Sequence, residues 1–283
     1  MKKITVSLLM LFAIIGAQAQ EVAVDTVASP WTAKGNFSLL GNQSSFTNWQ
    51  AGGDNNFAGT LGINYDINYQ SEDWSWDNKI QVNYGISKVK GSDSKKTDDR
   101  IELNSVLGKK ASGNWYYSVF LNFKTQLDAG MDPDDKELRN SHFFSPAYLQ
   151  IGPGMLWKKS DNLKVNFAPA TSRLIFVHKH FTELGPAFGV EQGDAMRYEL
   201  GASVSAYYKA NLMENVSIEN ILNLYSNYLE DPQNVDIDYQ LNLVLKINKY
   251  LSTNFSVQTV YDDNAFRGFQ VRQSVGVGLN YTF

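Results

Sequence analysis

The chain has 283 residues, a formal net charge of −4 and no cysteine. The absence of cysteine excludes disulfides, thiol chemistry and thiolate metal sites, and a mild acidic excess without basic clusters argues against a nucleic-acid partner. After the N-terminal region no apolar stretch approaches about 18 residues, so we expect no transmembrane helix. The 15 Tyr, 16 Phe and 6 Trp suit strands with one apolar and one polar face.

The first residues have the organisation of a secretory signal peptide. Two lysines precede the apolar run Ile4–Ile15, and Gly16–Ala19 supplies the small residues of a cleavage site. The run is shorter than the 20 residues or so that span a bilayer as a helix. We expect cleavage after Ala19. The predicted organisation is a signal peptide at 1–19, a short periplasmic tail at 20–30 and a barrel at 31–283.

Long runs with a period of two follow. In Phe57–Gln70 the odd positions are apolar, aromatic or glycine, and the even positions are polar or small; Trp115–Leu127 and Val235–Asn248 repeat the pattern. A helix would repeat near 3.6 residues instead. Membrane-crossing strands need about 9 to 11 residues, whereas strands of soluble proteins average about 5 or 6. The run lengths favour a membrane barrel over the alternative, a soluble β-fold.

The alternation predicts twelve strands in chain order. They cover 33–43, 57–70, 74–89, 100–110, 115–127, 146–157, 163–177, 196–209, 215–228, 235–248, 251–261 and 269–283. Short turns (71–73, 111–114, 158–162, 210–214, 248–250) alternate with longer loops (44–56, 91–99, 128–145, 178–195, 229–234, 262–268). Outer-membrane barrels alternate in this way. We therefore predict an all-β fold, a transmembrane antiparallel up-and-down β-barrel of about 12 strands in the outer membrane.

The final strand and the aromatic residues carry further predictions. Hydrophobic residues at every second position lead to Tyr281 and Phe283. This ending resembles the assembly signal that the barrel-assembly machinery recognises during biogenesis. Five aromatic residues beside the short turns are expected to form an anchoring girdle in contact with outer-membrane lipid. They are Trp74, Trp76, Trp115, Tyr117 and Trp157.

Charged residues on the polar face of the strands are candidates for lining the lumen. Those that we single out are Asp66, Lys79, Glu102, Lys124, Arg197, Glu199, Asp236, Asp238 and Arg272; Asp77, Glu219, Lys164, Lys209 and Lys246 share that face. The set contains seven acidic and seven basic residues, so its formal net charge is zero, whereas a strongly selective pore usually has a charge bias. The charges either pair and fill the bore or line a narrow, weakly selective channel.

No residue set points to enzymatic chemistry, a cofactor or a metal. His178, His180 and Glu183 could offer metal ligands, but they lack a diagnostic spacing. Barrel phospholipases need a histidine two residues before a serine, which this chain lacks. Barrel proteases need acidic and histidine pairs at the rim, and the residues of that chemistry here are Asp132, Asp134, Asp135 and His142. Since carboxylates are ordinary in loops, we expect no catalytic residue, and a barrel hydrolase is the least favoured function.

The segment Phe46–Asn56, with Trp31, Gly35 and Trp76–Asn78, resembles the start of a family of outer-membrane proteins from Bacteroidetes-type bacteria, the domain-of-unknown-function 3078 family. The resemblance implies a β-barrel of undefined function over nearly the whole mature chain, with no catalytic residues to transfer. The candidate structured first loop contains Trp49, Gly52, Gly53 and Asn55. Glycine tolerates tight turns, so this loop either folds over the barrel or closes simply.

Two functions follow as hypotheses. The first is a narrow pore for small solutes, because the polar face of the strands is rich in Asn, Ser, Gln and Gly. The second is a non-conducting accessory barrel that binds a partner protein in the cell envelope. In the loop 178–195, leaving Phe181, Leu184 and Phe188 in water would cost about 1.5 kcal/mol or more each. We therefore expect this loop, which also contains Pro186 and Ala187, either to fold inward over the barrel mouth or to pack against another loop or a partner.

Overall fold

The computed structural model describes residues 29–45, 54–131, 139–264 and 266–283. The chain divides into two units, Met1–Pro30 and Trp31–Phe283, and the second unit is the barrel. The predicted signal peptide and most of the predicted tail lie outside the described residues. Within those residues, no helix has the length and apolar character needed to cross a membrane.

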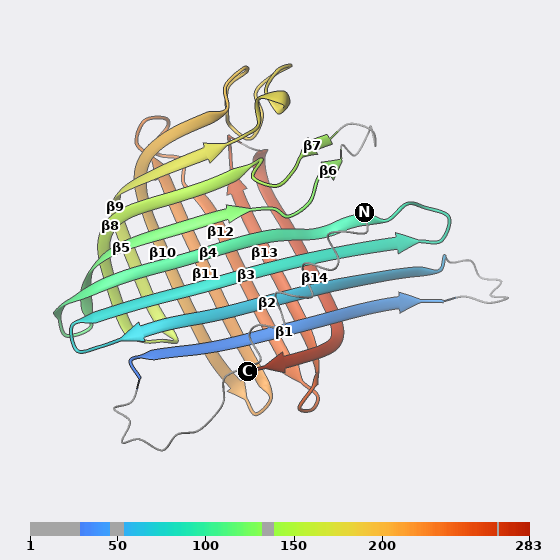
Figure 1. Cartoon of the computed structure of the whole chain (residues 1–283), viewed down its shortest axis with the longest axis horizontal. Helices are drawn as coiled ribbons and strands as arrows, with labels where there is room; N and C mark the ends of the chain where they lie inside the picture. Colours follow the sequence, from blue (N-terminus) through green and yellow to red (C-terminus); the bar gives the residue numbers. More distant parts are fainter. Residues whose placement is uncertain (1–28, 46–53, 132–138, 265) are drawn as a thin grey trace. The chain divides into compact units, whose positions relative to one another are not determined.

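The described part of the second unit forms a closed barrel of twelve antiparallel strands in up-and-down order (Figure 1). The barrel strands are β1 (Trp31–Ser44), β2 (Asn56–Gln70), β3 (Trp74–Val89), β4 (Lys95–Ser112), β5 (Trp115–Thr125), β8 (Ala147–Ser160), β9 (Leu163–Phe176), β10 (Met196–Met213), β11 (Val216–Asn227), β12 (Asp236–Lys246), β13 (Leu251–Asp262) and β14 (Phe266–Thr282). Each contains most of one predicted strand. The predicted fold is confirmed.

Several connections depart from their predicted bounds or content. The connections predicted at 91–99 and 262–268 are shorter, because β4 already begins at Lys95 and β14 at Phe266. Hydrophobic alternation cannot reveal such ends, since the strands continue there as a backbone ladder with polar side chains. The loop after β5 also holds a two-stranded sheet, β6 (Gly130–Met131) with β7 (Arg139–Ser141), and the loop after β9 holds a short 3-10 helix, η1 (Lys179–Phe181). Neither was predicted.

The barrel closes where the last strand meets the first. β1 and β14 pair from Asn36↔Thr282 to Gly41↔Val277. Beyond this ladder, the Gly35 N–H donates to the Phe283 carbonyl at 2.8 Å, and the Phe283 N–H donates back at 3.0 Å. A Cβ at position 35 would meet the end of the Phe283 ring, so this exposed ring, which now covers Gly35, would have to move for a larger residue to fit. Phe283 therefore takes part in barrel closure, while its role as an assembly signal, together with Tyr281, stays a prediction.

The outer surface of the barrel is apolar along its strands. Outward residues of β14 such as Val275 and Leu279 are more than half exposed. Beside the short turns, Trp31, Trp74, Trp76, Trp115 and Tyr117 are exposed, and Trp157 is half-buried. Each large apolar side chain left in water would cost about 1.5 kcal/mol or more. The exterior therefore suits a hydrocarbon environment with an aromatic belt at the interface.

The depth of an outward residue should set its tolerance of charge. Ile151 is exposed on β8 and pairs with Leu121, far from the short turns, whereas Tyr117 lies near the turn between β4 and β5. Ile151→Arg should lower the free energy of unfolding in lipid vesicles by about 2–4 kcal/mol, and Tyr117→Arg by about 0–1 kcal/mol. Denaturant titration measures both. Equal costs at the two positions would contradict a membrane-facing exterior.

Candidate functional site: the charged interior

Charged side chains from opposite walls meet inside the barrel. Lys79 on β3 places its Nζ 3.1 Å from Glu219 Oε1 on β11 and 3.3 Å from Asp66 Oδ1 on the neighbouring β2. In the strand order, β3 and β11 are six positions apart in either direction, which is the greatest separation in a ring of twelve. The contact between Lys79 and Glu219 therefore crosses the whole bore.

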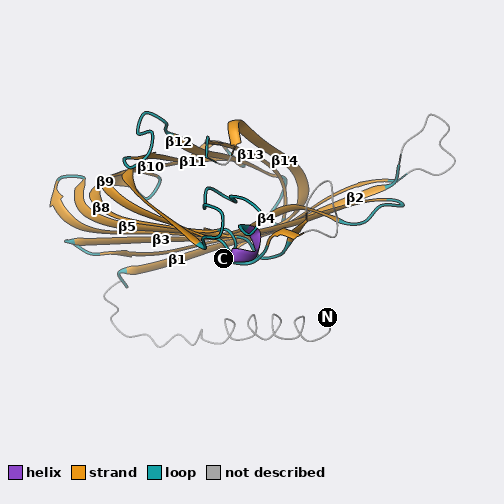
Figure 2. Ribbon diagram, turned by 90° about the horizontal axis from the view of Figure 1, so that it is seen from above, coloured by secondary structure: helices purple, strands orange, loops and turns teal. Residues whose placement is uncertain are grey.

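This crossing requires a flattened cross-section. Twelve strands spaced about 4.8 Å apart and tilted about 40° would enclose a round barrel about 24 Å across. A lysine and a glutamate together cannot span that width, so the two walls lie closer than in a round barrel. Figure 2 shows β11, β12 and β13 on the side that faces β1, β3 and β5.

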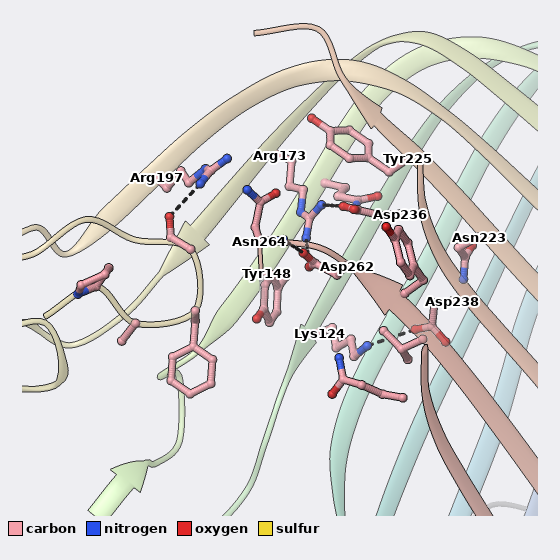
Figure 3. A pocket seen from close by; sticks show the side chains of 18 of the residues that line it. Lys124, Tyr148, Arg173, Arg197, Asn223, Tyr225, Asp236, Asp238, Asp262 and Asn264 are labelled. Carbon is pink, nitrogen blue, oxygen red and sulfur yellow. Dashed lines mark hydrogen bonds and ion pairs between the residues drawn. The ribbon is translucent and has the colours of Figure 1, made fainter. Parts of the chain in front are cut away.

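A second bridge crosses the bore nearer the long-loop end. Lys124 Nζ on β5 lies 3.1 Å from Asp238 Oδ2 on β12, and Gln258 Nε2 donates to the other oxygen of Asp238 at 2.8 Å. Figure 3 shows Lys124 and Asp238 pointing toward each other. Nearer the short turns, Asp77 lies 2.9 Å from Lys158 Nζ and 2.8 Å from Lys164 Nζ. The interior is thus crossed by ion pairs at several heights.

At the long-loop end, two arginines hold a larger number of carboxylates. Arg173 contacts Asp236, and it lies 3.3 Å from Asp262 and 3.6 Å from Glu199 (Figure 3). Its guanidinium also lies over the rings of Tyr225, at 5.0 Å, and Tyr148, at 5.7 Å. These contacts fix Arg173 in the wall of the mouth.

Arg197 is the second arginine of the mouth. Its Nε lies 2.9 Å from Glu199, it pairs with Glu230, and it donates to the Gly189 carbonyl at 2.9 Å. Asp263 places a carboxylate oxygen within 4.8 Å of those of Asp236 and Asp262. Three such oxygens could hold a metal ion, but Arg173 already supplies the counter-charge at that place.

The nine candidate lumen residues all make ion pairs. Besides the pairs above, Glu102 lies 3.6 Å from Arg100, and Arg272 on β14 contacts Asp98 on β4. The sequence interpretation missed four partners of these residues, which are Asp98, Arg100, Arg173 and Glu230. It also missed Lys158, which pairs with Asp77, and Asp262, which pairs with Arg173.

The omission of Arg173 has a definite structural cause. On β9, Ala168 pairs with Ser203 but Thr171 pairs with Gly201, so β9 contains one extra residue at this point. Such a bulge reverses which positions face inward. Lys164 faces inward before the bulge at an even position, and Arg173 faces inward after it at an odd one. Lys158 was assigned to a turn, and Asp98 lies before the predicted start of its strand. For neither residue, therefore, could the alternation predict that its side chain faces the interior.

Two cavities occupy the interior. The mouth cavity has a volume of about 1120 Å³ and is lined mainly by the ends of β4, β5 and β8 to β14 that lie nearer the long loops, and by the loop after β9. The inner cavity has about 200 Å³ and lies toward the short turns, where Asp77, Lys79 and Lys164 line it. Ser205 and Asn223, on β10 and β11, line both cavities. The two spaces therefore adjoin along this wall of small and amide side chains.

The loop at 177–195 folds toward the mouth, as predicted. Phe181, Ala187 and Phe188 pack against a buried cluster of Ile175, Val177 and Val190, and all three line the mouth cavity. Leu184 is the exception, because it remains 98 % exposed although it lines the mouth cavity. The bond from Arg197 to the Gly189 carbonyl holds the loop to the wall.

The remaining candidates lie in the loops. The His142 and His178 rings lie 5.5 Å apart, and His180 Nδ1 lies 3.6 Å from Glu183. In the first loop, the Asn55 carbonyl accepts a bond from the Lys90 N–H at 2.8 Å. Trp49, Gly52 and Gly53 lie outside the described residues, as do Asp132, Asp134 and Asp135.

A double-mutant cycle tests the central bridge. Lys79→Met should lower the free energy of unfolding by about 3–5 kcal/mol, because it leaves the buried carboxylate of Glu219 without its cation. The double variant Lys79→Met/Glu219→Gln removes both charges and should recover a large part of that loss. Denaturant titration in lipid vesicles measures each variant. A double variant less stable than Lys79→Met would contradict the pairing.

Solved structures with a similar fold are outer-membrane barrels of low identity. An outer membrane channel from Pseudomonas putida F1 is 8 % identical, with 94 % of this chain and 100 % of that chain covered and a TM-score of 0.41. The translocator domain of the autotransporter NalP from Neisseria meningitidis is 9 % identical, with 99 % and 95 % covered and a TM-score of 0.36. The comparison with curated proteins gave no match. A family model described as a protein of unknown function (DUF3078) matches residues 41–131, which confirms the resemblance to that family over this stretch.

Proposed function

We propose that the chain forms a narrow outer-membrane pathway for small polar solutes. The observation that carries this proposal is that the mouth cavity and the inner cavity adjoin along Ser205 and Asn223. A hydrated solute could move along this wall past the two bridges, Lys79–Glu219 and Lys124–Asp238, without breaking the barrel. The bridges limit the width of the pathway, so we expect a small conductance.

Placement in the outer membrane is part of this proposal. The apolar exterior and the aromatic residues beside the short turns support contact with lipid. The predicted signal peptide at 1–19 would direct the chain to the Sec pathway, and the ending at Tyr281 and Phe283 would direct it to the barrel-assembly machinery. The short turns would then face the periplasm, and the mouth cavity would open to the outside.

Removing a bridge should widen the pathway. In planar bilayers the wild-type protein should give small, steady single-channel currents. Lys79→Ala/Glu219→Ala removes one bridge without changing the net charge, and its conductance should rise severalfold. Glu72→Gln/Glu214→Gln, in two short turns, is a control of similar size outside both cavities and should conduct like the wild type. A silent wild type that stays silent in the bridge variant would overturn the proposed pathway.

Deletion of the folded loop gives an independent test. Removing Thr182–Gln192 takes away part of the mouth lining, including Phe188, while the ladder between β9 and β10 remains. Conductance should increase, and the barrel should keep its heat-modifiable mobility in gel electrophoresis. Unchanged conductance, with rapid proteolysis of the intact loop, would show that this loop does not narrow the mouth.

The alternative function is a non-conducting barrel that binds an envelope protein. The observation that favours it is the exposure of apolar side chains on the long loops, where Leu184 is 98 % exposed and Phe143 and Leu229 more than half exposed. Isolation from native membranes in mild detergent separates the two functions. Co-purification of one stoichiometric partner with a silent barrel supports the accessory function, whereas a lone conducting barrel supports the pathway. Neither function assigns a catalytic residue, a cofactor or a metal.

A further inference from the structure

The two cavities differ in the sign of their charge. Among the described residues, seven carboxylates and four Lys or Arg side chains line the mouth cavity, a formal excess of three negative charges. Three carboxylates and four lysines line the inner cavity, an excess of one positive charge. The balance of acids and bases along the whole bore therefore conceals an acidic mouth.

The excess at the mouth is visible in its contacts. Arg173 and Arg197 are together in contact with four carboxylates, of which Asp236, Asp262 and Glu230 line the cavity and Glu199 lies behind it. On the folded loop, Glu191 also lines the cavity and forms no ion pair within the described part of the chain. The two guanidiniums cannot neutralise this set, so the cavity attracts cations.

The rest of the lining suits an organic cation better than a bare ion. Five aromatic side chains line the cavity: Tyr148, Phe181, Phe188, Tyr225 and Tyr261. Arg173 already lies over the rings of Tyr148 and Tyr225, so the rings that no Lys or Arg of the described residues covers are Phe181, Phe188 and Tyr261. Aromatic faces attract ammonium groups when both lie in a partly desolvated site. A volume of about 1120 Å³ is slightly above the range of about 300–1,000 Å³ for small-molecule pockets, and it greatly exceeds the space that a single metal ion needs.

We infer that the mouth cavity binds small organic cations, such as protonated or quaternary amines, in preference to anions. This inference rests on the proposed function for its biological meaning, because the pathway would deliver such a solute to the inner cavity. The binding itself depends only on the cavity and is measurable on a barrel that does not conduct.

Three matched ligands test the inference. Benzyltrimethylammonium, benzyl alcohol and benzoate share a ring and differ in charge. Isothermal titration calorimetry on the full-length protein in detergent at low salt should show the cation binding at least about tenfold more tightly than benzoate. Raising the salt to about 1 M should weaken this preference, because the Debye length falls to about 3 Å. Benzoate binding as tightly as the cation, or no binding of the cation, would overturn the inference.

Charge variants test the source of the preference. Glu183→Gln/Glu191→Gln, both on exposed positions of the mouth loop, should weaken binding of the cation by about fivefold, the effect of two unit charges about 8 Å away in water. Glu72→Gln/Glu214→Gln changes the net charge equally at the opposite turns and should leave the affinity unchanged. Equal losses in both variants would show a general charge effect and would overturn the assignment to the mouth.

The outcomes separate this inference from the proposed pathway. If the cation binds to a barrel that carries no current, the inference is supported and the proposed pathway is excluded. A conducting barrel that selects anions in a salt gradient supports the pathway and overturns the inference. Displacement of benzyltrimethylammonium by Ca²⁺ at equal concentration would assign the acidic mouth to metal ions and would also overturn it.

Discussion

The rest of the barrel depends on one constraint, which is that charges inside the bore need partners of opposite sign. The ion pair between Lys79 and Glu219 is the clearest example. A charge removed from bulk water is costly unless an opposite charge and hydrogen bonds compensate it. The inward positions of these long strands carry many charges, so the walls must approach until partners meet. A round barrel of twelve strands would hold these side chains apart. The flattened cross-section brings these partners within ion-pair distance.

The same pairing gives the two ends of the bore different properties. Toward the short turns, one carboxylate, Asp77, is held by two lysines. At the mouth the ratio is reversed, because Arg173 alone contacts three carboxylates. Electrostatic potentials in a narrow, partly desolvated space are stronger than those at an exposed surface. The end of the bore near the long loops is therefore an acidic, aromatic cavity, and the loop that packs on Ile175 and Val177 supplies part of its lining.

The apolar packing of the loop after β9 also places part of this loop in the lining of the mouth cavity. Phe181, Ala187 and Phe188 bury their apolar surface against the end of β9, which holds the loop over the mouth. This burial brings Glu191 to the cavity and leaves Leu184 at the surface. One stretch of sequence thus supplies an anchor, a charged lining and an exposed apolar residue that a partner could contact.

Sequence alone determined the number of strands, their approximate bounds and, except between β13 and β14, the alternation of short turns with long loops, because period-two patterning is a local property of each strand. It also identified the charged residues that face inward wherever that phase is unbroken, as at Lys79 and Asp238. It could not place Arg173, since a one-residue bulge in β9 reverses the phase and leaves no mark in the alternation. Which charges meet, and the unequal sharing of acids and bases between the cavities, were decided by tertiary structure. Those contacts join strands up to six positions apart around the barrel, and their distances depend on how far the closed sheet flattens.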